Sequence, residues 1–320
     1  MPKAIICSQP TGLNSLEFGE LAISDPADHE VLIKVAYAGV NYPDTLIIQG
    51  KYQFVPDGPF APGQEVSGEV IKVGKGVEHV VEGDIVIASM TWGGYSEVTK
   101  AHADNVYLLP PGISMEKGAV ILETFGTVIH ALRDRGGVKA GETMAILGAS
   151  GGIGSAAIQL GKIFGIQTVA VCSTEEKRKE ALSNGANIAI GYDNLKTSLK
   201  QFDVDVVLDP VGGEMAEQAF RSLRSGGRHL VVGFASGKIP SIPLNLPLLK
   251  SASIVGVFWG SFWRENPLAN RSNILMVLKW IAQNKVDVPL GKIYPLREAA
   301  VALEELMERR AIGKSVLKVS

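Results

Sequence analysis

The sequence predicts a two-domain α/β protein in which an all-β barrel or sandwich precedes a doubly wound parallel sheet. Two observations support this prediction. The first 110 residues hold short β-branched runs separated by Gly, Pro and Asp, whereas strands and helices alternate from about residue 115. Short strands with frequent turn signals are typical of barrels and sandwiches. Strands separated by helices of about 10 to 15 residues form right-handed crossovers and a parallel sheet.

Composition narrows the class of protein. The 320 residues suffice for two domains, and 46% hydrophobic with 20% charged residues is ordinary for a globular chain. A net charge of -2 argues against nucleic acid or an anionic membrane as a partner. No stretch approaches the roughly 18 apolar residues of a membrane span, and the N-terminus enters a predicted strand instead of a signal peptide. Cys7 and Cys172 form no disulfide framework, which favours the cytoplasm.

The predicted elements follow the chain in order. Strands are expected at 31–40, 67–77 and 83–89, then a helix at 115–137. The βα alternation that follows ends with the apolar strand SIVGVFWG. The C-terminal pieces are a helical stretch at 261–285, a helix at 297–310 and the strand KSVLKVS. They do not extend the alternation, so we expect residues 1–122 and 264–320 to form the first domain and residues 123–263 the second.

The sharpest local signal is TMAILGASGGIGSAAIQLGKIFG (143–165), a strand, a loop of small residues and a helix. Aligned with the pattern G-x-G-x-x-G, the three positions are Ala149, Gly151 and Gly154, so alanine replaces the first glycine. Small residues permit the turn and let the backbone approach a pyrophosphate, which meets free N–H groups at the helix start. The alternative is a tight turn without a ligand. The further βα units favour dinucleotide binding.

The end of the next strand bears on the choice of cofactor. Enzymes that use NAD carry an acidic ribose-binding residue there, but residues 172–174 read Cys-Ser-Thr. Lys177 and Arg178 follow and can meet the extra phosphate of NADPH. Alternatively, one of the hydroxyl groups only caps the next helix, and Glu175 serves as the acid. The pattern favours NADPH.

Long stretches of this sequence carry a resemblance to a known family. The stretch VAYAGVNYPDTLIIQGKYQFVPDGPFAPGQEVSGEVIKVG (35–74) and the loop GASGGIGSAAIQLGK are the most specific, and DPVGG, GGRHLVVGFASG and GKSVLKV follow in the same order. Over its whole length the chain resembles the NADPH:quinone oxidoreductase (zeta-crystallin-like) branch of the medium-chain dehydrogenase/reductase superfamily. This resemblance implies a GroES-like catalytic domain, a Rossmann domain and bound NADPH.

The resemblance also implies positions that contact NADPH. The pyrophosphate would meet the loop and the helix start, the adenosine phosphate would meet the next two strand ends, and the nicotinamide would lie near residues of both domains. In that order, the implied residues are Ser150, Gly151, Gly152 and Ile153; Ser173, Lys177 and Tyr192; and Asn41, Thr127, Val232, Gly233, Phe234, Ala235, Phe258, Trp259 and Gly260.

Metal ligands of the zinc-dependent relatives are missing. Those relatives carry a cysteine near the position of Asn41, a histidine at that of Gln64 and a four-cysteine lobe, whereas residues 88–100 here contain no cysteine. Zinc takes sulfur, imidazole or carboxylate ligands, and Glu65 alone cannot supply a tetrahedral set. The five histidines fit structural or surface roles. We therefore expect no metal.

The segment NYPDTLIIQGKY supplies the candidate catalytic residues. Asn41 can donate an amide hydrogen bond, Asp44 can relay a proton, and Tyr52 can donate from its phenolic O–H. Each has a structural alternative, since Asn41 and Asp44 flank a proline turn and Tyr52 can pack against Phe54. The resemblance favours Asn41 and Tyr52, because relatives place equivalent residues beside the nicotinamide.

Without a Lewis acid, quinones and conjugated enones are the acceptors of choice, because they delocalise the negative charge that hydride transfer creates. We therefore expect NADPH-dependent reduction of a quinone. Leu46 and Ile48 replace an aromatic and a basic residue of many quinone reductases, and the run IQGKY also occurs in enoyl thioester reductases. An NADPH-dependent reductase of α,β-unsaturated carbonyls is thus the alternative. A third hypothesis is an NADPH-binding protein without useful turnover.

The segment SASIVGVFWGSF (251–262) suggests a partner. It is an apolar final strand of the nucleotide sheet, and an exposed apolar edge is an aggregation hazard. Pairing with the same strand of a second subunit removes that hazard, and the resembling family forms dimers in this way. Burial under the neighbouring helix is the alternative. We expect a homodimer.

Overall fold

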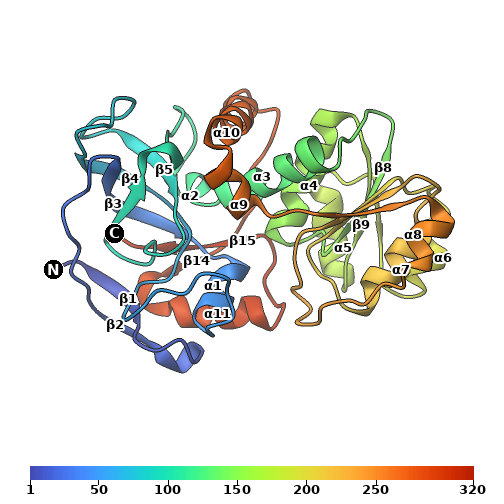
Figure 1. Cartoon of the computed structure of the whole chain (residues 1–320), viewed down its shortest axis with the longest axis horizontal. Coiled ribbons are helices and arrows are strands. Elements are labelled where there is room, and N and C mark those ends of the chain that lie inside the picture. Colours follow the sequence, from blue (N-terminus) through green and yellow to red (C-terminus); the bar gives the residue numbers. More distant parts are fainter. The chain divides into compact units, whose positions relative to one another are not determined.

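The chain forms two structural units, each built around its own β-sheet (Figure 1). The computed structural model describes residues 1–320. The first unit comprises Met1–Glu123 and Leu290–Ser320, and the second comprises Thr124–Pro289. The sequence predicted a boundary between residues 263 and 264, whereas residues 264–289 belong to the second unit.

A seven-stranded sheet forms the centre of the first unit. The order is β14-β15-β3-β4-β5-β7, and β6 also pairs with β3. Only β14 and β15 are parallel, and β1 and β2 form a separate antiparallel pair. The strands are β1 (Lys3–Cys7), β2 (Leu16–Glu20), β3 (Glu30–Gly39), β4 (Glu65–Val73), β5 (Ile85–Ser89), β6 (Val98–His102), β7 (Val106–Leu108), β14 (Leu290–Pro295) and β15 (Lys314–Lys318).

Alternation of side chains explains the core of this unit. In β3, Val31, Ile33 and Val35 are fully buried, whereas Lys34 between them is exposed. Successive side chains of a strand point to opposite faces, so this period of two directs one face into the core. Short helices connect the strands: η1 (Leu13–Ser15), α1 (Tyr42–Ile47), η2 (Ala103–Asn105), α2 (Met115–Gly118), η4 (Leu296–Glu298) and α11 (Ala299–Met307).

The C-terminal strand lies in the interior of the first sheet and not at its edge. Strand β15 lies between β14 and β3, and the amide of Val40 donates to the carbonyl of Ser315 at 3.0 Å. Helix α11 buries Ala299, Ala302 and Leu303. The last residues of the chain therefore lie beside the segment that follows β3.

The second unit contains a six-stranded parallel sheet in the order β10-β9-β8-β11-β12-β13. All five residues of β8 are buried, as expected for a parallel strand covered on both faces. The order changes direction between β8 and β11, which is where open α/β sheets bind ligands at their carboxyl ends. The strands are β8 (Thr143–Leu147), β9 (Gln167–Val171), β10 (Ile188–Ile190), β11 (Val206–Asp209), β12 (Arg228–Val231) and β13 (Ser253–Gly256).

Helices cover this sheet. Buried residues of α6, α7 and α8 share one hydrophobic cluster with the strands, and α4 contacts β8 and β9. Helix α5 contacts β9 and β10, and the remaining helices lie before β8 or after β13. The helices are α3 (Leu122–Ile129), η3 (His130–Arg135, a π-helix), α4 (Gly152–Phe164), α5 (Glu175–Ser183), α6 (Leu195–Lys200), α7 (Glu214–Ser222), α8 (Asn245–Lys250), α9 (Trp259–Glu265) and α10 (Pro267–Ala282).

Helix α10 accounts for the position of the boundary. Its Asn270 and Asn273 are buried and bond to Trp259 and Asp134 of the second unit at 2.8 Å each. Buried amides need such partners, so the helix belongs with the elements that supply them. No helix in the structure combines the length and the apolar character that a membrane crossing requires.

Candidate functional site

The predicted phosphate loop connects β8 to α4 in the second unit. Gly148 turns the chain with a φ of 62°, so the left-handed residue is the glycine before Ala149. A Cβ at Gly154 would lie 2.4 Å from the Cα of Ala149, which shows that this glycine allows helix and strand to pack closely. A Cβ at Gly151 would meet only one atom, at 3.4 Å. The loop therefore leaves space in front of the first turn of α4, where N–H groups lack helical acceptors.

The end of β9 carries hydroxyl groups instead of an acid. Thr174 caps α5 by accepting from the amide of Lys177 at 3.2 Å, whereas Ser173 is exposed. Glu175, the alternative candidate for the ribose-binding acid, is the exposed first residue of α5 and pairs with Lys179 at 3.0 Å. Hydroxyl groups and a half-buried Lys177 thus occupy the position that selects the adenosine ribose.

Tyr192, which follows β10, contacts the phosphate loop. Its phenolic oxygen accepts from the amide of Gly148 at 2.9 Å. The structure thereby brings the strand ends of β8 and β10 together, although 44 residues separate the two partners. The thiol of Cys172 is also buried against Ser150 of the loop, and burial raises the pKa of this thiol.

The segment after β12 is held by Asp209 at the end of β11. The backbone carbonyl of Asp209 accepts from the amides of Val232 and Gly233 at 2.9 and 3.3 Å. Its Oδ1 accepts from Gly212 at 2.7 Å, and its Oδ2 bonds to the ring of His229 at 3.0 Å. The motif DPVGG alone does not indicate that Asp209 and His229 anchor this segment.

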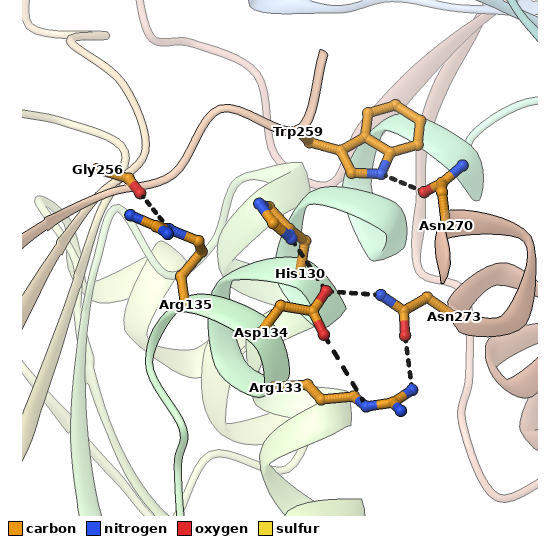
Figure 2. Close-up of polar contacts among 8 residues, drawn as sticks. All are labelled: His130, Arg133, Asp134, Arg135, Gly256, Trp259, Asn270 and Asn273. Atoms are coloured by element: carbon orange, nitrogen blue, oxygen red, sulfur yellow. Dashed lines mark hydrogen bonds and ion pairs between the residues drawn. The ribbon is translucent and has the colours of Figure 1, made fainter. Parts of the chain in front are cut away.

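Trp259 fixes the start of the predicted nicotinamide segment Phe258–Gly260. The indole is 4% exposed and donates to Asn270 Oδ1 at 2.8 Å, as Figure 2 shows. A Cβ at Gly126 would lie 2.6 Å from the indole, so this glycine lets the ring pack against α3 beside Thr127. Phe258 remains 44% exposed.

A polar cluster on the π-helix supports the same region (Figure 2). The ring of His130 stacks on Phe262 at 4.1 Å between centroids and bonds to Asp134 at 3.0 Å. Asn273 donates to Asp134 and accepts from Arg133, at 2.8 and 2.7 Å. Burial lowers the pKa of His130, so the neutral ring is the favoured form at neutral pH.

Two predicted catalytic residues, Asn41 and Asp44, form one motif in the first unit. They form a capping box at the start of α1, in which the backbone N–H of Asn41 donates to Asp44 Oδ2 at 2.8 Å. The hydroxyl of Tyr95 donates to the same oxygen at 2.8 Å. Asp44 is fully buried, and burial raises its pKa to about 7. Asp44 is therefore poised to exchange a proton near neutral pH.

The side-chain amide of Asn41 lies in a buried ionic cluster. Its Nδ2 donates to Glu65 Oε1 at 3.2 Å, and its Oδ1 accepts from the ammonium of Lys314. Glu65 Oε2 accepts from the backbone amide of Glu123 at 3.0 Å. Burial raises the pKa of Glu65, and the nearby Lys314 opposes that shift.

The arrangement around Gln64 does not fit a zinc ion. The amide of Gln64 is 3% exposed and donates to the carbonyl of Thr91 at 3.3 Å. The adjacent Glu65 faces the ammonium of Lys314 at 3.3 Å, and no group of three His, Cys, Asp or Glu side chains is placed to hold a metal. Amides and an ammonium group do not provide the donors that zinc requires.

Tyr52, the third predicted catalytic residue, lies in an irregular segment after α1. Its side chain is half-buried and packs against the hydrophobic core of the first unit. Ile48, which stands where many quinone reductases carry a basic residue, is fully buried in that core. Tyr52 thus keeps a partly accessible side chain, whereas Ile48 does not.

Family models match both parts of the chain. The alcohol dehydrogenase GroES-like domain matches residues 27–157, and the zinc-binding dehydrogenase model matches residues 152–272. Quinone oxidoreductase-like protein 2 of Bos taurus is 34% identical over 91% of this chain and 85% of that protein. Quinone oxidoreductase of Sus scrofa is 35% identical over 93% and 92%. This chain belongs to the quinone oxidoreductase family.

A solved structure extends the comparison with the quinone oxidoreductase family. Escherichia coli quinone oxidoreductase, crystallised in complex with NADPH, shares 29% identity and superposes with a TM-score of 0.91 over 99% of this chain and 100% of that one. The predicted resemblance and the fold class, a GroES-like domain with a Rossmann-like parallel sheet, are thereby confirmed. As a member of this family, the chain is an oxidoreductase.

Some residues of the site escaped sequence reasoning in this quinone oxidoreductase family member. The sequence patterns assigned no role to Lys314, which lies in GKSVLKV, or to Tyr95. A lysine at the start of an apolar strand and a tyrosine after two glycines carry weak signals by themselves. Only their contacts with Asn41, Glu65 and Asp44 reveal a connected polar cluster.

Proposed function

We propose that the chain is an NADPH-dependent quinone oxidoreductase that acts without zinc. The observation that carries this proposal is the end of β9, where Ser173 and Lys177 replace an acid beside a phosphate-binding loop. The names of the similar proteins from cattle, pig and Escherichia coli support the quinone as acceptor. The NADPH bound to the Escherichia coli protein supports the cofactor.

Each part of the second unit has a role in binding NADPH. Ser150, Gly151, Gly152 and Ile153 contact the pyrophosphate at the start of α4, where Gly152 and Ile153 in the first turn offer backbone N–H groups. The N–H of Gly151 instead donates to the carbonyl of Gly148 at 3.0 Å. Ser173, Lys177 and Tyr192 bind the adenosine phosphate. The nicotinamide is contacted by Asn41 and Thr127, by the backbone of Val232, Gly233, Phe234 and Ala235, and by Phe258, Trp259 and Gly260.

The reaction needs no metal because a quinone delocalises negative charge. Bound NADPH supplies the hydride. Asn41 and Tyr52 orient the acceptor by hydrogen bonds, and Tyr52 delivers a proton to the reduced oxygen. Asp44 holds Asn41 through its backbone and exchanges a proton near neutral pH, which suits a relay. The ammonium of Lys314 next to Glu65 favours a zinc-free site.

A reductase of α,β-unsaturated carbonyls is the second candidate. The burial of Ile48 in the core favours it, because the basic residue of many quinone reductases at this position is replaced by a side chain that cannot reach an acceptor. Tyr52 would then protonate an enolate instead of a reduced quinone.

An assay of NADPH oxidation separates the two candidate reactions. It compares 1,4-benzoquinone, a 2-alkenal and crotonyl-CoA as acceptors under the same conditions. We expect the highest kcat/KM with the quinone. Turnover of the enones alone would leave the second candidate, and tight NADPH binding without turnover on any acceptor would indicate a binding protein. A Tyr52→Phe variant that kept the full rate would remove Tyr52 from the mechanism. A stoichiometric zinc content would contradict the metal-free reaction.

The cofactor preference has its own test. The double variant Ser173→Asp with Lys177→Ala removes the cation and adds the missing acid. We expect it to lower the affinity for NADPH about tenfold and to improve that for NADH, since charge-assisted hydrogen bonds contribute about 1.5 to 3 kcal/mol. Equal dissociation constants for both cofactors in the unmodified protein would contradict the assignment.

We also propose a cytoplasmic homodimer. Strand β13 is the last strand of its sheet, and Ile254 on it is 43% exposed. Leu244, Leu248 and Leu249, in and beside α8, are 83%, 77% and 76% exposed. Exposed apolar side chains therefore occur a few residues before β13 in the chain. The two buried free cysteines suit a reducing compartment. Sedimentation at micromolar concentration tests the dimer, and a monomer would contradict it.

A further inference from the structure

Lys314 is a buried cation in the first unit. It begins β15, which lies between two other strands, and the residue is only 8% exposed. An ammonium group taken out of water is costly unless it is paired and hydrogen-bonded. Its partners therefore explain why lysine occupies this position.

Three side chains form a closed set of contacts at this point. The ammonium of Lys314 donates to Asn41 Oδ1 and lies 3.3 Å from Glu65 Oε1. The same Glu65 oxygen accepts from Asn41 Nδ2 at 3.2 Å. The other Glu65 oxygen accepts from the amide of Glu123 at 3.0 Å. The groups bonded to Glu65 are hydrogen-bond donors, which suits an ionised carboxylate. The buried carboxyls of Asp44 and Glu123 also lie near enough to interact with Glu65, and that interaction raises the pKa of both.

The two charges allow only one orientation of the Asn41 amide. Lys314 can only donate, and an ionised Glu65 can only accept. A half-turn of the amide would place its NH2 against the ammonium and its oxygen against the carboxylate. Both hydrogen bonds would become repulsive contacts. The pair of Lys314 and Glu65 therefore discriminates between two amide orientations of nearly identical shape.

One hydrogen of this amide is left weakly bonded. Its second acceptor is the carbonyl of Gly39, at 3.4 Å, near the limit of a hydrogen bond. The absence of a side chain at Gly39 is also required, because a Cβ there would lie 2.6 Å from Glu65 Oε1. In the orientation that the charges impose, Asn41 can give this hydrogen to a bound ligand.

We propose that Lys314 and Glu65 are positioning residues that fix the amide of Asn41 in the orientation from which it donates to the cofactor or acceptor. This inference rests on the proposed function only for the identity of the ligand. The orientation itself is a property of the first unit and is measurable without turnover.

The test compares three variants with the unmodified protein: Lys314→Met, Glu65→Gln and the double variant. Each single change leaves an unpaired group in a buried site, so we expect a lower melting temperature. The double variant removes both charges together, and we expect it to recover most of the lost stability. A Lys3→Met variant, which breaks the exposed pair with Glu20, is the matched control and should change neither stability nor rate.

Activity then separates positioning from structural support. We expect the folded double variant to lose at least about tenfold in kcat, because misplaced catalytic groups cost this much or more, with a small change in the NADPH dissociation constant. A double variant that recovered both stability and rate would overturn the proposal.

A second readout does not depend on activity. In protein labelled with ¹⁵N-asparagine, the side-chain NH2 of Asn41, assigned with an Asn41→Ser variant, should exchange slowly with water and lose this protection in the double variant. Fast exchange in the unmodified protein would overturn the proposal. Protected signals in a protein that turns over no acceptor would support the positioning and contradict the proposed function.

Discussion

The buried carboxyl of Asp44 should make the stability of the protein depend on pH. Burial raises the pKa of Asp44 from 3.8 to about 7, although Asn41 and Tyr95 donate hydrogen bonds to it. Between these two values the folded state holds a proton that the unfolded state has released. The free energy of unfolding therefore falls as pH rises through this window and levels off above the folded-state pKa.

The size of the effect follows from the shift. Each pH unit in the window changes the free energy of unfolding by about 1.36 kcal/mol. From about pH 5.5 to about pH 7 this amounts to about 2 kcal/mol, with little further change up to about pH 8. An Asp44→Asn variant cannot titrate, and its amide oxygen can still accept from Asn41 and Tyr95. We expect the variant to lack this component of the pH dependence.

Urea unfolding followed by circular dichroism at several pH values measures the difference between the two proteins. The unmodified protein should lose about 2 kcal/mol more than Asp44→Asn between about pH 5.5 and about pH 8. Glu20→Gln serves as a control, because Lys3 lowers the pKa of exposed Glu20 and keeps its titration below this range. Parallel pH profiles for the unmodified protein and Asp44→Asn would refute the reasoning.

Two further changes probe the nucleotide unit. Gly154→Ala would push a Cβ to 2.4 Å from the Cα of Ala149, so we expect a loss of about 1 to 3 kcal/mol in stability and weaker NADPH binding, measured by urea unfolding and by quenching of protein fluorescence. Unchanged stability and affinity would contradict the packing role of this glycine. Trp259→Phe removes the indole N–H that donates to Asn270 Oδ1, and we expect the free energy of unfolding, followed by thermal denaturation, to fall by about 1 to 3 kcal/mol. An unaltered melting temperature would show that the bond contributes little.

Local patterns were enough to predict the fold class and the phosphate loop. Alternation in β3 and the continuous burial of β8 follow from residue periodicity, and the spacing of Gly151 and Gly154 reflects local backbone requirements. The position of the positive φ was less evident, since Gly148 supplies it and not Ala149. These features depend on neighbours within a few residues, so a sequence contains the information directly.

The cap of α5 and the unit to which α10 belongs were predicted only in part from the sequence. The sequence left open whether a hydroxyl group caps α5, and the structure assigns the cap to Thr174, which leaves Ser173 exposed. Helix α10 was predicted as a helix, but its amides bond within the second unit. Periodicity indicates that a helix forms, whereas its partners depend on contacts that periodicity does not encode.

The sequence by itself determined the two kinds of sheet, the glycine-rich loop and the absence of thiols and imidazoles at the zinc positions. Only the tertiary structure decided that Lys314 from the last strand meets Asn41 and Glu65, residues 273 and 249 positions earlier in the chain. The physical reason is that backbone conformation follows from local residue preferences. The pairing of a buried charge, in contrast, depends on which distant strand lies beside it.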